Sequence, residues 1–591
     1  MSEPTAEQRA AIERAPEDKI LVNAGAGTGK TFVLIQRLIY LVEQHALAPG
    51  SQVLVLSFSR AAVSEVKRRA RESDGVAAYS GAKTFDSFAT HLLALTTDSD
   101  AWSELSYEER IQSATDAVLN NPATKQHIQS YRHLLIDEIQ DLVGARAAFV
   151  DALLQASEGG ISLFGDPAQS IYDHQARDAS EMTSVDLYQS IRSRYGSELC
   201  EITLTRNFRA LTPKPREALH FGPLLQNPTA DIDTVNEDLE RFVLSLPAMG
   251  DLSYVISAWQ RNPPSSDIIL CRTNGQALAF FQLLQAKGVR CRLKDSSAHR
   301  AAPAWIAAAV LGREGAQVSK AVMLEKLGQY CDAEVAEHRW RRLKRLDGRR
   351  GNSLDLRAVA SNIGNRSLPE ELYDVPQAGV MISTIHRAKG LEFDRVFVTK
   401  PLHDESITGS PIEEARILYV AITRAKQWLG AVNDPNTKAM AKHKPTGRWC
   451  RFAYRGKRRF AEAIELLPTD IDQSIHTDGL REGEPSFIDT QRYLQESVQS
   501  GDPIELTLLK SAEEGPLYQV RHQSRAIART SASFGKSVKL IGQSKIPETI
   551  NGAVVSEIET VAGSPEESRR AGVGTSGLWL GLRISGLAQL C

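Results

Sequence analysis

The apolar positions of the chain come in short runs, and each run is followed by a polar loop and then by a helical pattern. The run at 19–23 leads into a glycine-rich loop and a helix expected over 31–43. The runs at 52–57, 133–136 and 161–164 also end in polar loops. Strand, loop and helix in repetition are typical of a parallel α/β sheet, whose ligands bind at the carboxyl ends of the strands.

The same pattern returns in the second half of the chain. Strands are expected at 267–271, 380–383 and 395–398, and helices at 276–286 and 413–426. Because the pattern occurs twice with a break between, it predicts two α/β cores.

The domain boundaries follow from where this pattern starts and stops. We expect residues 1–87 and 128–210 to form the first core, 88–127 a short helical insertion, 211–291 and 374–433 the second core, 292–373 a helical and partly basic insertion, 434–500 a linker rich in basic and aromatic residues, and 501–591 a small β-rich domain. The last expectation rests on short alternating runs at 504–509, 517–521, 538–541, 553–558 and 578–584, which glycine, proline and serine separate.

Composition mainly excludes classes of protein. The 591 residues are 42% hydrophobic and 24% charged, as in ordinary globular proteins. No apolar run approaches the roughly 20 residues that span a bilayer, and the start, Met1-Ser2-Glu3-Pro4, does not resemble a secretion signal. The six cysteines lie far apart without a C-x-x-C pair, which argues against a zinc module and fits a reducing cytoplasm.

The net charge of −2 does not indicate a nucleic-acid binder, so local basic segments decide the question. One lies at 339–350, where a solvated helix face and a phosphate contact both stay open. The other lies at 442–459 and interleaves basic residues with Trp449, Phe452 and Tyr454. Aromatic rings among cations can stack on nucleobases, so the second segment favours nucleic acid more.

The first polar loop has the composition of a phosphate-binding loop. It reads Ala24-Gly25-Ala26-Gly27-Thr28-Gly29-Lys30-Thr31. Glycines let backbone N–H groups turn around phosphates, Lys30 would reach the terminal phosphates, and Thr31 would bind Mg²⁺. Ala24 takes the place of the usual first glycine. A chance glycine-rich turn is the alternative, and the flanking strand and helix argue against it.

Two acids supply the complement of this loop. The run at 133–136 ends in Asp137 and Glu138. Asp137 would hold the metal ion through water, and Glu138 would polarise the attacking water. A strand that ends in two acids is common by itself, but beside a phosphate loop it predicts nucleotide hydrolysis.

Further motifs follow in order, and from about Thr5 to Leu429 the chain resembles superfamily 1 helicases of the UvrD/Rep/PcrA type. The motifs are Thr5–Gln8, Ser57–Arg60, Lys83–Phe88, Gly165–Tyr172, Arg206–Arg209, Ile269–Asn274, Thr384–Phe393 and Glu414–Ala425. The resemblance implies two RecA-like P-loop NTPase cores, ATP and Mg²⁺ as cofactors, and 3′-to-5′ helicase or translocase activity on single-stranded DNA.

The resemblance also implies roles for single residues. On the nucleotide side these are Gln8 and Phe208 at adenine, Glu392 at the ribose, and Gln169, Arg209 and Arg424 at the γ-phosphate. On the DNA side they are Phe58, Arg60, Thr84, Phe85, Tyr172, His174, Arg272, Thr384, His386 and Lys389. Guanidinium groups would stabilise the transition state when the cores close, so that hydrolysis drives stepping.

Three positions depart from the family pattern. Phe32 stands where the family has an arginine that stacks on adenine, His174 where it has a tryptophan that stacks on a base, and Asp86 where it has a histidine near a phosphate. The expected insertions are also shorter than in the larger helicases of this type. Translocation is therefore a firmer expectation than processive unwinding.

Two alternatives stay open beside the helicase. One is a translocase that strips proteins or serves a partner nuclease; since the tail has no convincing Asp…Glu-x-Lys constellation, cleavage would need another subunit. The other is a nucleotide-gated binding module without turnover. The expected partners are single-stranded DNA, with or without a duplex junction, and a protein docked on the C-terminal domain, but no membrane. DNA and RNA are not distinguished.

Overall fold

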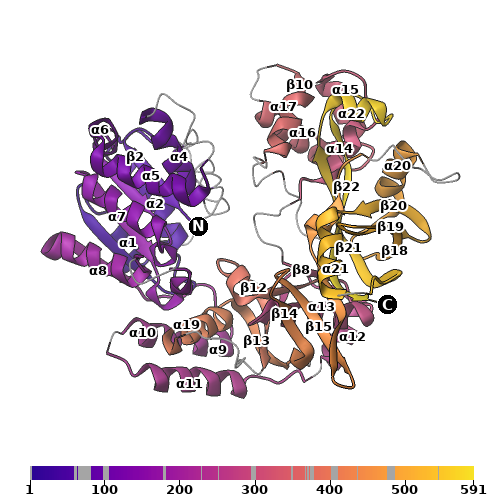
Figure 1. Cartoon of the computed structure of the whole chain (residues 1–591). Coiled ribbons are helices and arrows are strands. Elements are labelled where there is room, and N and C mark those ends of the chain that lie inside the picture. The colour runs from indigo at the N-terminus through magenta and orange to yellow at the C-terminus, as the bar shows by residue number, and fades with distance from the viewer. Residues whose placement is uncertain are drawn as a thin grey trace. The chain divides into compact units, whose positions relative to one another are not determined.

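The computed structural model divides the chain into two compact units (Figure 1). Unit 1 holds Met1–Ala248, Lys389–Val398 and Leu402–Ala431, and unit 2 holds Met249–Ala388, Thr399–Pro401 and Val432–Cys591. The structure describes residues 3–58, 63, 81–96, 105–176, 181–227, 229–250, 252–294, 301–347, 351–365, 368, 372, 378–400, 410–435, 437–475, 486–542 and 545–590.

A six-stranded parallel sheet forms the centre of unit 1, in the order β3-β2-β4-β5-β1-β6. Its strands are β1 (Lys19–Ala24), β2 (Val53–Ser57), β3 (Ala82–Thr84), β4 (His133–Ile136), β5 (Gly160–Gly165) and β6 (Leu199–Leu204). The strands expected at 19–23, 52–57, 133–136 and 161–164 are confirmed to within one residue. Since β4, β5 and β1 are neighbours, the loops that follow them meet at one edge of the sheet.

Helices cover both faces of this sheet. They are α1 (Ala6–Ile12), α2 (Lys30–Glu43), α4 (Phe85–Thr96), α5 (Tyr107–Asn120), α6 (Pro122–Gln129), α7 (Ala145–Ala156) and α8 (Ser184–Tyr195), and unit 1 also holds α9 (Pro213–Glu217), α10 (Phe221–Gln226), α11 (Ile232–Ser245) and α19 (Pro411–Ile422). Leu134 and Ile136 of β4 pack in the core with α4 to α8, whereas Leu135 packs with α1 and α2. Burial on both faces explains why the strand is a continuous apolar run.

Unit 2 contains a second group of parallel strands, in which β11 (Val380–Thr384) lies between β7 (Asp267–Cys271) and β8 (Cys291–Leu293). The helices α12 (Ser253–Arg261), α13 (Asn274–Ala286) and α18 (Ile385–Ala388) belong to this part. Two more strands, β12 (Phe393–Lys400) and β13 (Ala425–Asn433), have their residues divided between the units. The predicted fold class, α/β with two parallel-sheet cores and a β-rich C-terminal part, is confirmed.

The β-rich part is one nine-stranded sheet in the order β14-β15-β16-β22-β21-β18-β19-β20-β17. Its strands are β14 (Met440–His443), β15 (Arg448–Arg455), β16 (Arg458–Leu466), β17 (Ile471–Asp472), β18 (Pro503–Ala512), β19 (Gly515–His522), β20 (Arg525–Thr530), β21 (Thr549–Ala562) and β22 (Leu578–Leu590). The region 434–500 is therefore not a linker, because it contributes β14 to β17 to this sheet, together with helix α20 (Phe487–Ser497).

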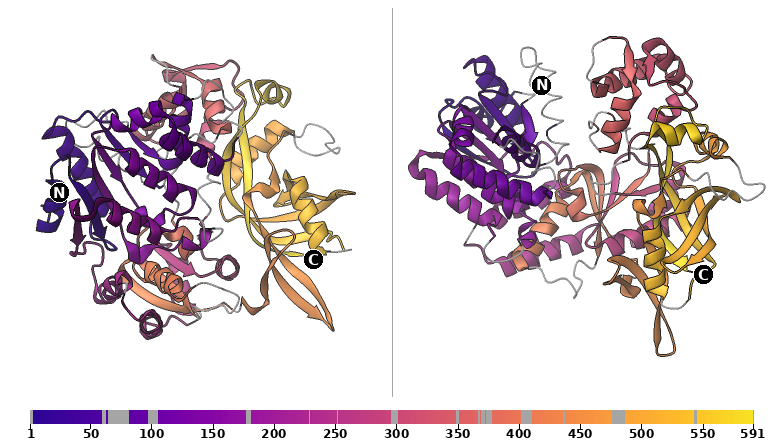
Figure 2. Two further views of the ribbon diagram at one scale, coloured as in Figure 1. Left: turned by 60° about the vertical axis from the view of Figure 1, so that its left-hand side comes forward. Right: turned by 45° about the horizontal axis from the view of Figure 1, so that its top comes forward.

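The helical insertion packs on this sheet in the same unit (Figure 2). It consists of α14 (Ala304–Val310), α15 (Lys320–Leu327), α16 (Ala333–Asp347) and α17 (Leu356–Gly364), with the short strands β9 (Gln317–Ser319) and β10 (Ser353–Asp355). One hydrophobic core joins both parts, and the backbone N–H of Ala307 donates to Thr560 Oγ1 at 3.0 Å. Segments expected as separate domains thus fold as one body.

One expected element is wrong, and another ends earlier than expected. Residues 538–541 are not a strand but lie in helix α21 (Ala532–Gly542). Its buried residues Phe534, Val538 and Ile541 are spaced by four and three, which is a helical period. The helix expected over 413–426 ends at Ile422, and its last two residues begin β13. No helix of the described chain is long and apolar enough to cross a membrane.

Candidate functional site

The phosphate-type loop joins β1 to α2 in unit 1. Gly27 and Gly29 have φ of 74° and 88°, a left-handed backbone that favours glycine. A Cβ on Gly27 would lie 2.5 Å from Cβ of Arg209, so a larger residue would also clash. The two glycines therefore permit both the turn and the close approach of Arg209.

Gln8 is held against this loop. It lies in α1, where Thr5 and Gln8 form a capping box, and its side chain is buried. Gln8 Nε2 donates to the carbonyl of Thr28 at 3.0 Å. The structure thus brings the expected adenine-reading residue to the loop itself.

The Arg206–Arg209 motif lies on the other side of the loop. Asn207 Nδ2 donates to the carbonyl of Ala26 at 2.5 Å, and the backbone N–H of Phe208 donates to the carbonyl of Gly27 at 2.9 Å. The Phe208 ring remains 41% exposed. An exposed ring beside a phosphate-type loop is available to stack on a base.

Lys30 and the two acids after β4 form a charged group in which Asp137 is buried and Lys30 and Glu138 are partly buried. Lys30 Nζ makes an ion pair with Glu138 and lies 4.0 Å from Asp137 Oδ1. Burial alone would raise the pKa of Glu138, but the charge of Lys30 outweighs it and lowers this pKa to about 2. Burial and the neighbouring Glu138 raise the pKa of Asp137 to about 7. Burial by itself would lower the pKa of Lys30, but the charges of Glu138 and Asp137 outweigh burial and raise this pKa, so Lys30 stays protonated.

Glu138 occupies a strained backbone position. Its φ of 56° and ψ of 43° are in the left-handed region, which costs a non-glycine residue about 1–3 kcal/mol. Its carboxylate accepts from Gln140 Nε2 at 2.5 Å as well as from Lys30. A strained acid directly after a core strand is typical of a functional position.

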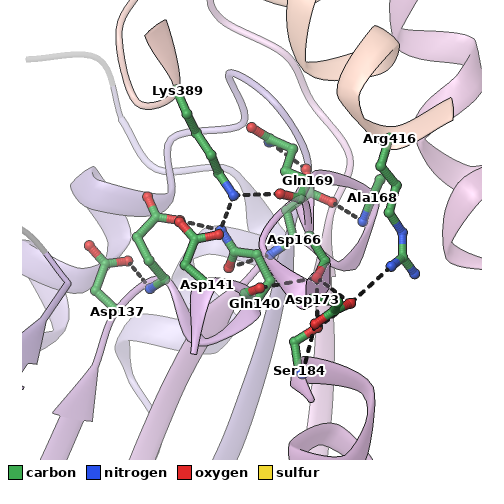
Figure 3. A network of polar contacts seen from close by, with 12 residues as sticks. Asp137, Gln140, Asp141, Asp166, Ala168, Gln169, Asp173, Ser184, Lys389 and Arg416 are labelled. Atoms are coloured by element: carbon green, nitrogen blue, oxygen red, sulfur yellow. Dashed lines mark hydrogen bonds and ion pairs between the residues drawn. The ribbon is translucent and has the colours of Figure 1, made fainter. Parts of the chain in front are cut away.

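Hydrogen bonds continue from Gln140 towards α19 (Figure 3). Gln140 Oε1 accepts from the backbone N–H of Asp166 at 3.1 Å. Asp166 Oδ2 accepts from Gln169 Nε2 at 2.6 Å, and Gln169 Oε1 accepts from Arg424 Nη2 at 2.7 Å. Because each member is buried, the series connects the loops after β4 and β5 with the end of α19 inside unit 1.

Both expected arginine fingers belong to this unit. Arg424 is buried, and burial together with the charge of Arg209 lowers its pKa to about 9. Arg209 Nε lies 2.9 Å from Glu392 Oε2, and Lys426 Nζ lies 2.6 Å from Glu392 Oε1. Glu392, expected at the ribose, is thus held by two cations.

Lys389 lies where the sequence does not predict it. Its side chain was expected towards the strand, but it is buried, forms an ion pair with Asp141 and donates to the carbonyl of Gln169 (Figure 3). Its ammonium also lies 5.0 Å from the centre of the Tyr172 ring. The polar network attracts the cation because a buried carboxylate such as Asp141 needs a partner.

Two of the expected DNA-side aromatics of unit 1 lie together. The rings of Phe58 and Tyr172 stack at 6.1 Å with an angle of 15° between them. Phe85 does not join them, because it is 1% exposed and packs in the core. Its spacing of three from Phe88 places it on the apolar face of α4, so its prediction as a DNA contact is corrected.

The departures at Asp86 and His174 have partners within unit 1. Asp86 Oδ1 accepts from Arg146 Nη2 at 2.8 Å, which neutralises the carboxylate that stands in place of a histidine. His174 Nδ1 lies 2.5 Å from Glu413 Oε1, so its ring is tied to α19 while the side chain stays 47% exposed.

The remaining DNA-side residues are placed as follows. Thr84 Oγ1 accepts from the backbone N–H of Ser87 at 3.2 Å at the start of α4. Arg60 lies outside the described residues. In unit 2, Arg272 directly follows the last residue of β7, Cys271. Thr384, the last residue of β11, is the Cα partner of Cys271, so Arg272 and Thr384 lie at the same end of the two strands. His386 follows in α18.

Several residues of the network were not predicted to have a role. They are Gln140, Asp141, Asp166, Asn207, Gln226 and Arg416. Gln140 and Asp141 follow the acidic pair after one apolar residue, Ile139, and both are buried. Polar residues that continue a buried strand exit are the signal that could have identified them.

The donor set suits Mg²⁺ in part. Asp137 and Thr31 offer a carboxylate and a hydroxyl oxygen, and Mg²⁺ commonly takes one or two such ligands and completes its shell with water and substrate phosphates. Among the described residues, no group of three or more His, Cys, Asp or Glu could hold a metal ion alone. The residues therefore fit a Mg²⁺ ion that arrives with a nucleotide.

Comparison with known proteins shows what the chain is similar to. The UvrD/REP helicase N-terminal domain matches residues 4–104 and 95–187, and the UvrD-like helicase C-terminal domain matches residues 354–431. A probable DNA helicase of Mycoplasma pneumoniae is 26% identical over 474 residues, which cover 72% of this chain and 82% of that protein. ATP-dependent DNA helicase UvrD2 of Mycobacterium tuberculosis is 23% identical over 553 residues, which cover 71% and 77%. A crystal structure of Pif1 helicase from Candida albicans is 14% identical over 73% of this chain and 95% of that chain. Its TM-score is 0.38, and this likeness is too low to support an inference.

Proposed function

Because the chain belongs to the UvrD/Rep family of ATP-dependent DNA helicases, we propose that it hydrolyses ATP at the Lys30 loop and moves 3′ to 5′ along single-stranded DNA. The observation that carries this proposal is the unbroken series of contacts within unit 1. It runs through Lys30, Glu138, Gln140, Asp166, Gln169 and Arg424.

The chemical step follows from the groups at its two ends. Lys30 and the loop N–H groups bind the phosphates, while Glu138, ionised at neutral pH, accepts a proton from the attacking water. Asp137 and Thr31 would hold Mg²⁺, which when bound neutralises charge on the phosphate oxygens. When a phosphate enters the site, it competes with Glu138 for Lys30. Glu138 then leaves its ion pair with Lys30 and can act as the general base.

Arg209 and Arg424 act at the γ-phosphate. Arg424 is held by Gln169 and by the carbonyl of Val420 at 3.0 Å, so the guanidinium is oriented before substrate binds. Arg209 leaves Glu392 for the nucleotide, and Glu392 keeps Lys426 as its partner. Gln169 would sense whether the γ-phosphate is present, because it contacts both Asp166 and Arg424.

The nucleotide state would reach the strand through Lys389. This lysine contacts Asp141 and Gln169 O on the nucleotide side, and it lies over Tyr172, which stacks on Phe58. A change in the Gln169 loop therefore moves the cation beneath the aromatic pair. Stacking of a base on this pair is how we propose that hydrolysis changes the grip on DNA.

Turnover of ATP tests this function, measured side by side with single-stranded DNA, duplex DNA, RNA and no polymer. We expect single-stranded DNA to stimulate turnover most. Polarity is measured by displacement of streptavidin from biotinylated oligonucleotides, which 3′-to-5′ movement accelerates at the 5′ end. Turnover that no polymer changes would contradict the proposal.

Translocation without strand separation is the second candidate. It is favoured by the helical insertion, which is taken up in one hydrophobic core with the C-terminal sheet of unit 2. Such a translocase would strip proteins from DNA or serve a partner. A forked duplex distinguishes the two, because ATP turnover and streptavidin displacement without unwinding would favour this candidate.

A further inference from the structure

The hairpin of β15 and β16 in unit 2 has a root that is firmly anchored. Arg448 is buried and makes two hydrogen bonds to Asp470, at 2.7 and 2.5 Å, and one to the carbonyl of Glu465 at 2.9 Å. Cys450 and Ile464, which are opposite each other, belong to the core of the unit. The root therefore holds the hairpin in a fixed orientation.

The root also lies against the elements that carry the expected DNA contacts of unit 2. Trp449 packs on Gly275 so closely that a Cβ there would lie 2.7 Å from the indole. Gly275 lies in α13, three residues after Arg272. Glu465, which accepts from the backbone N–H of Trp449, is near enough to Arg387 of α18 for that charge to act on it. The hairpin thus begins beside the strand ends at Arg272.

The tip of the hairpin, residues 451–461, has the opposite character. It contains five basic residues and no acidic one. The side chains of Arg455, Lys457 and Arg459 are exposed, and with Arg451 they form no ion pair with any residue that the structure describes. Within one hairpin, Arg448 at the root is buried and paired, while Arg455, Lys457 and Arg459 at the tip are exposed to solvent.

Exposed aromatic rings accompany these cations. Tyr454 is 70% and Phe460 is 43% exposed. Tyr454 pairs with Arg459, and the guanidinium of Arg459 lies 3.8 Å from the centre of the Phe452 ring on the same face. Phe460 pairs with Ala453 and so lies on the other face. In Figure 2 the end of the hairpin extends beyond the neighbouring elements of its unit.

The basic helix α16 shows that this arrangement is not a general property of basic segments. Arg341 lies 3.5 Å from Glu337, Lys344 forms an ion pair with Asp347, and the guanidinium of Arg339 lies 4.8 Å from the Trp305 ring. These cations serve the fold of the insertion. Their segment therefore fits the solvated helix face that the sequence left open.

We propose that the tip of this hairpin binds single-stranded DNA beyond the strand path at Arg272. Tyr454 stacks on a base, since every base offers a π-face, and Arg455 and Lys457 contact phosphates. An unpaired strand fits better than a duplex because stacking requires an unstacked base. The proposal rests on the proposed function, since it lengthens the DNA path of that translocase.

The test is the affinity of the full chain for fluorescein-labelled oligothymidylate, measured by anisotropy without nucleotide. We expect Tyr454→Ala to weaken binding about tenfold, and Tyr454→Phe to retain it, because stacking needs the ring and not the hydroxyl. Arg455→Glu/Lys457→Glu should weaken binding at least as much. It should also reduce the slope of log K against log salt by about 1.4, which is two phosphate contacts of about 0.7 each.

A matched control is Lys326→Glu/Arg345→Glu, at exposed positions of α15 and α16, which changes the net charge by the same amount. We expect its affinity and salt slope to equal those of the unchanged chain, and thermal melting shows that each variant is folded. An equal loss in this control would mean that overall charge, not the hairpin, is measured, and would overturn the proposal.

Two further results would overturn it. One is unchanged affinity for the oligothymidylate in both hairpin variants, which would point to an acidic protein as the partner. The other is a loss confined to duplex DNA. If the unchanged chain itself does not bind DNA, the proposed function fails; if it binds and the hairpin variants bind equally well, only the hairpin proposal fails.

Discussion

The nucleotide site of unit 1 and the hairpin tip of unit 2 use the same kinds of cation in opposite ways. The side chains of Lys389 and Arg424 are buried and that of Lys30 is largely buried, and each contacts a carboxylate or an amide oxygen. Arg455, Lys457 and Arg459 are exposed and have no such contact among the described residues. A buried charge is costly without a partner, whereas water solvates an exposed one. Basic residues at an active centre therefore form a network, and those on a binding surface act separately.

The largest expected effect comes from removing one member of the network. Lys30→Ala should lower ATP turnover by more than about 10³-fold, because it removes a phosphate contact and leaves the buried Asp137 and the partly buried Glu138 without their cation. The measurement is phosphate release with saturating single-stranded DNA. Lys125→Ala, an exposed lysine of α6 in the same unit, is the control and should retain full turnover. Strand-stimulated turnover that survives in Lys30→Ala would refute the assignment of this loop.

A smaller effect is expected where the charge is kept but its contacts are lost. Arg424→Lys should lower kcat about 100-fold, because lysine cannot bond both Gln169 and the carbonyl of Val420. KM for ATP should change much less, since the loss concerns the transition state. Steady-state kinetics over a range of ATP concentration separate the two constants. A raised KM with unchanged kcat would assign Arg424 to ground-state binding.

His133 is a third case beside the buried, paired cations and the exposed ones: it is a buried imidazole without a partner of opposite charge among the residues that the structure describes. Burial, assisted by Arg37, lowers its pKa from 6.5 to about 3, while its ring contacts the carbonyl of Pro16 at 2.7 Å and Ser162 Oγ at 2.9 Å. In the unfolded chain His133 takes up a proton below about pH 6.5, whereas in the folded chain it stays neutral down to about pH 3. Stability is thus fully present above 6.5 and falls by about 2 kcal/mol on going to pH 5.

Denaturant unfolding of the full chain at several pH values measures this loss. His133→Asn keeps a donor for the Pro16 carbonyl but cannot take up a proton. The free energy of unfolding of this variant should therefore be lower at pH 7, and it should depend less on pH below 7. An equally steep fall in the variant would assign the acid sensitivity to other groups.

Much of unit 1 could be predicted because its signals are local. The strand at 133–136 and the acids after it are consecutive, and so are the glycines before Lys30. Burial on both faces of a parallel sheet leaves a continuous apolar run that reads clearly. The neighbours of these loops then follow from the strand order, in which β4, β5 and β1 are adjacent.

What could not be predicted depends on partners far apart in the sequence. Pro303 bridges to Glu559, and this pairing joins the insertion to the C-terminal sheet. Lys389 turns to Asp141 across 248 positions, so no local pattern indicates that it avoids the strand. Phe85 differs from these cases, because its motif suggests a surface role although its spacing of three from Phe88 already indicates the apolar face of α4, where it packs in the core.

The smallest effect is expected for a single cation of the hairpin, and it tests the comparison most directly. Lys457→Ala should weaken the binding of oligothymidylate only about twofold and reduce the salt slope by about 0.7, because one exposed phosphate contact is lost and no buried partner is left behind. In the double variant Arg455→Ala/Lys457→Ala, the changes in binding free energy of the two single variants should add, since the two side chains share no carboxylate among the described residues. Anisotropy titrations of both single variants and the double variant measure this. Strong non-additivity would show that the tip, like the nucleotide site, works as a coupled network.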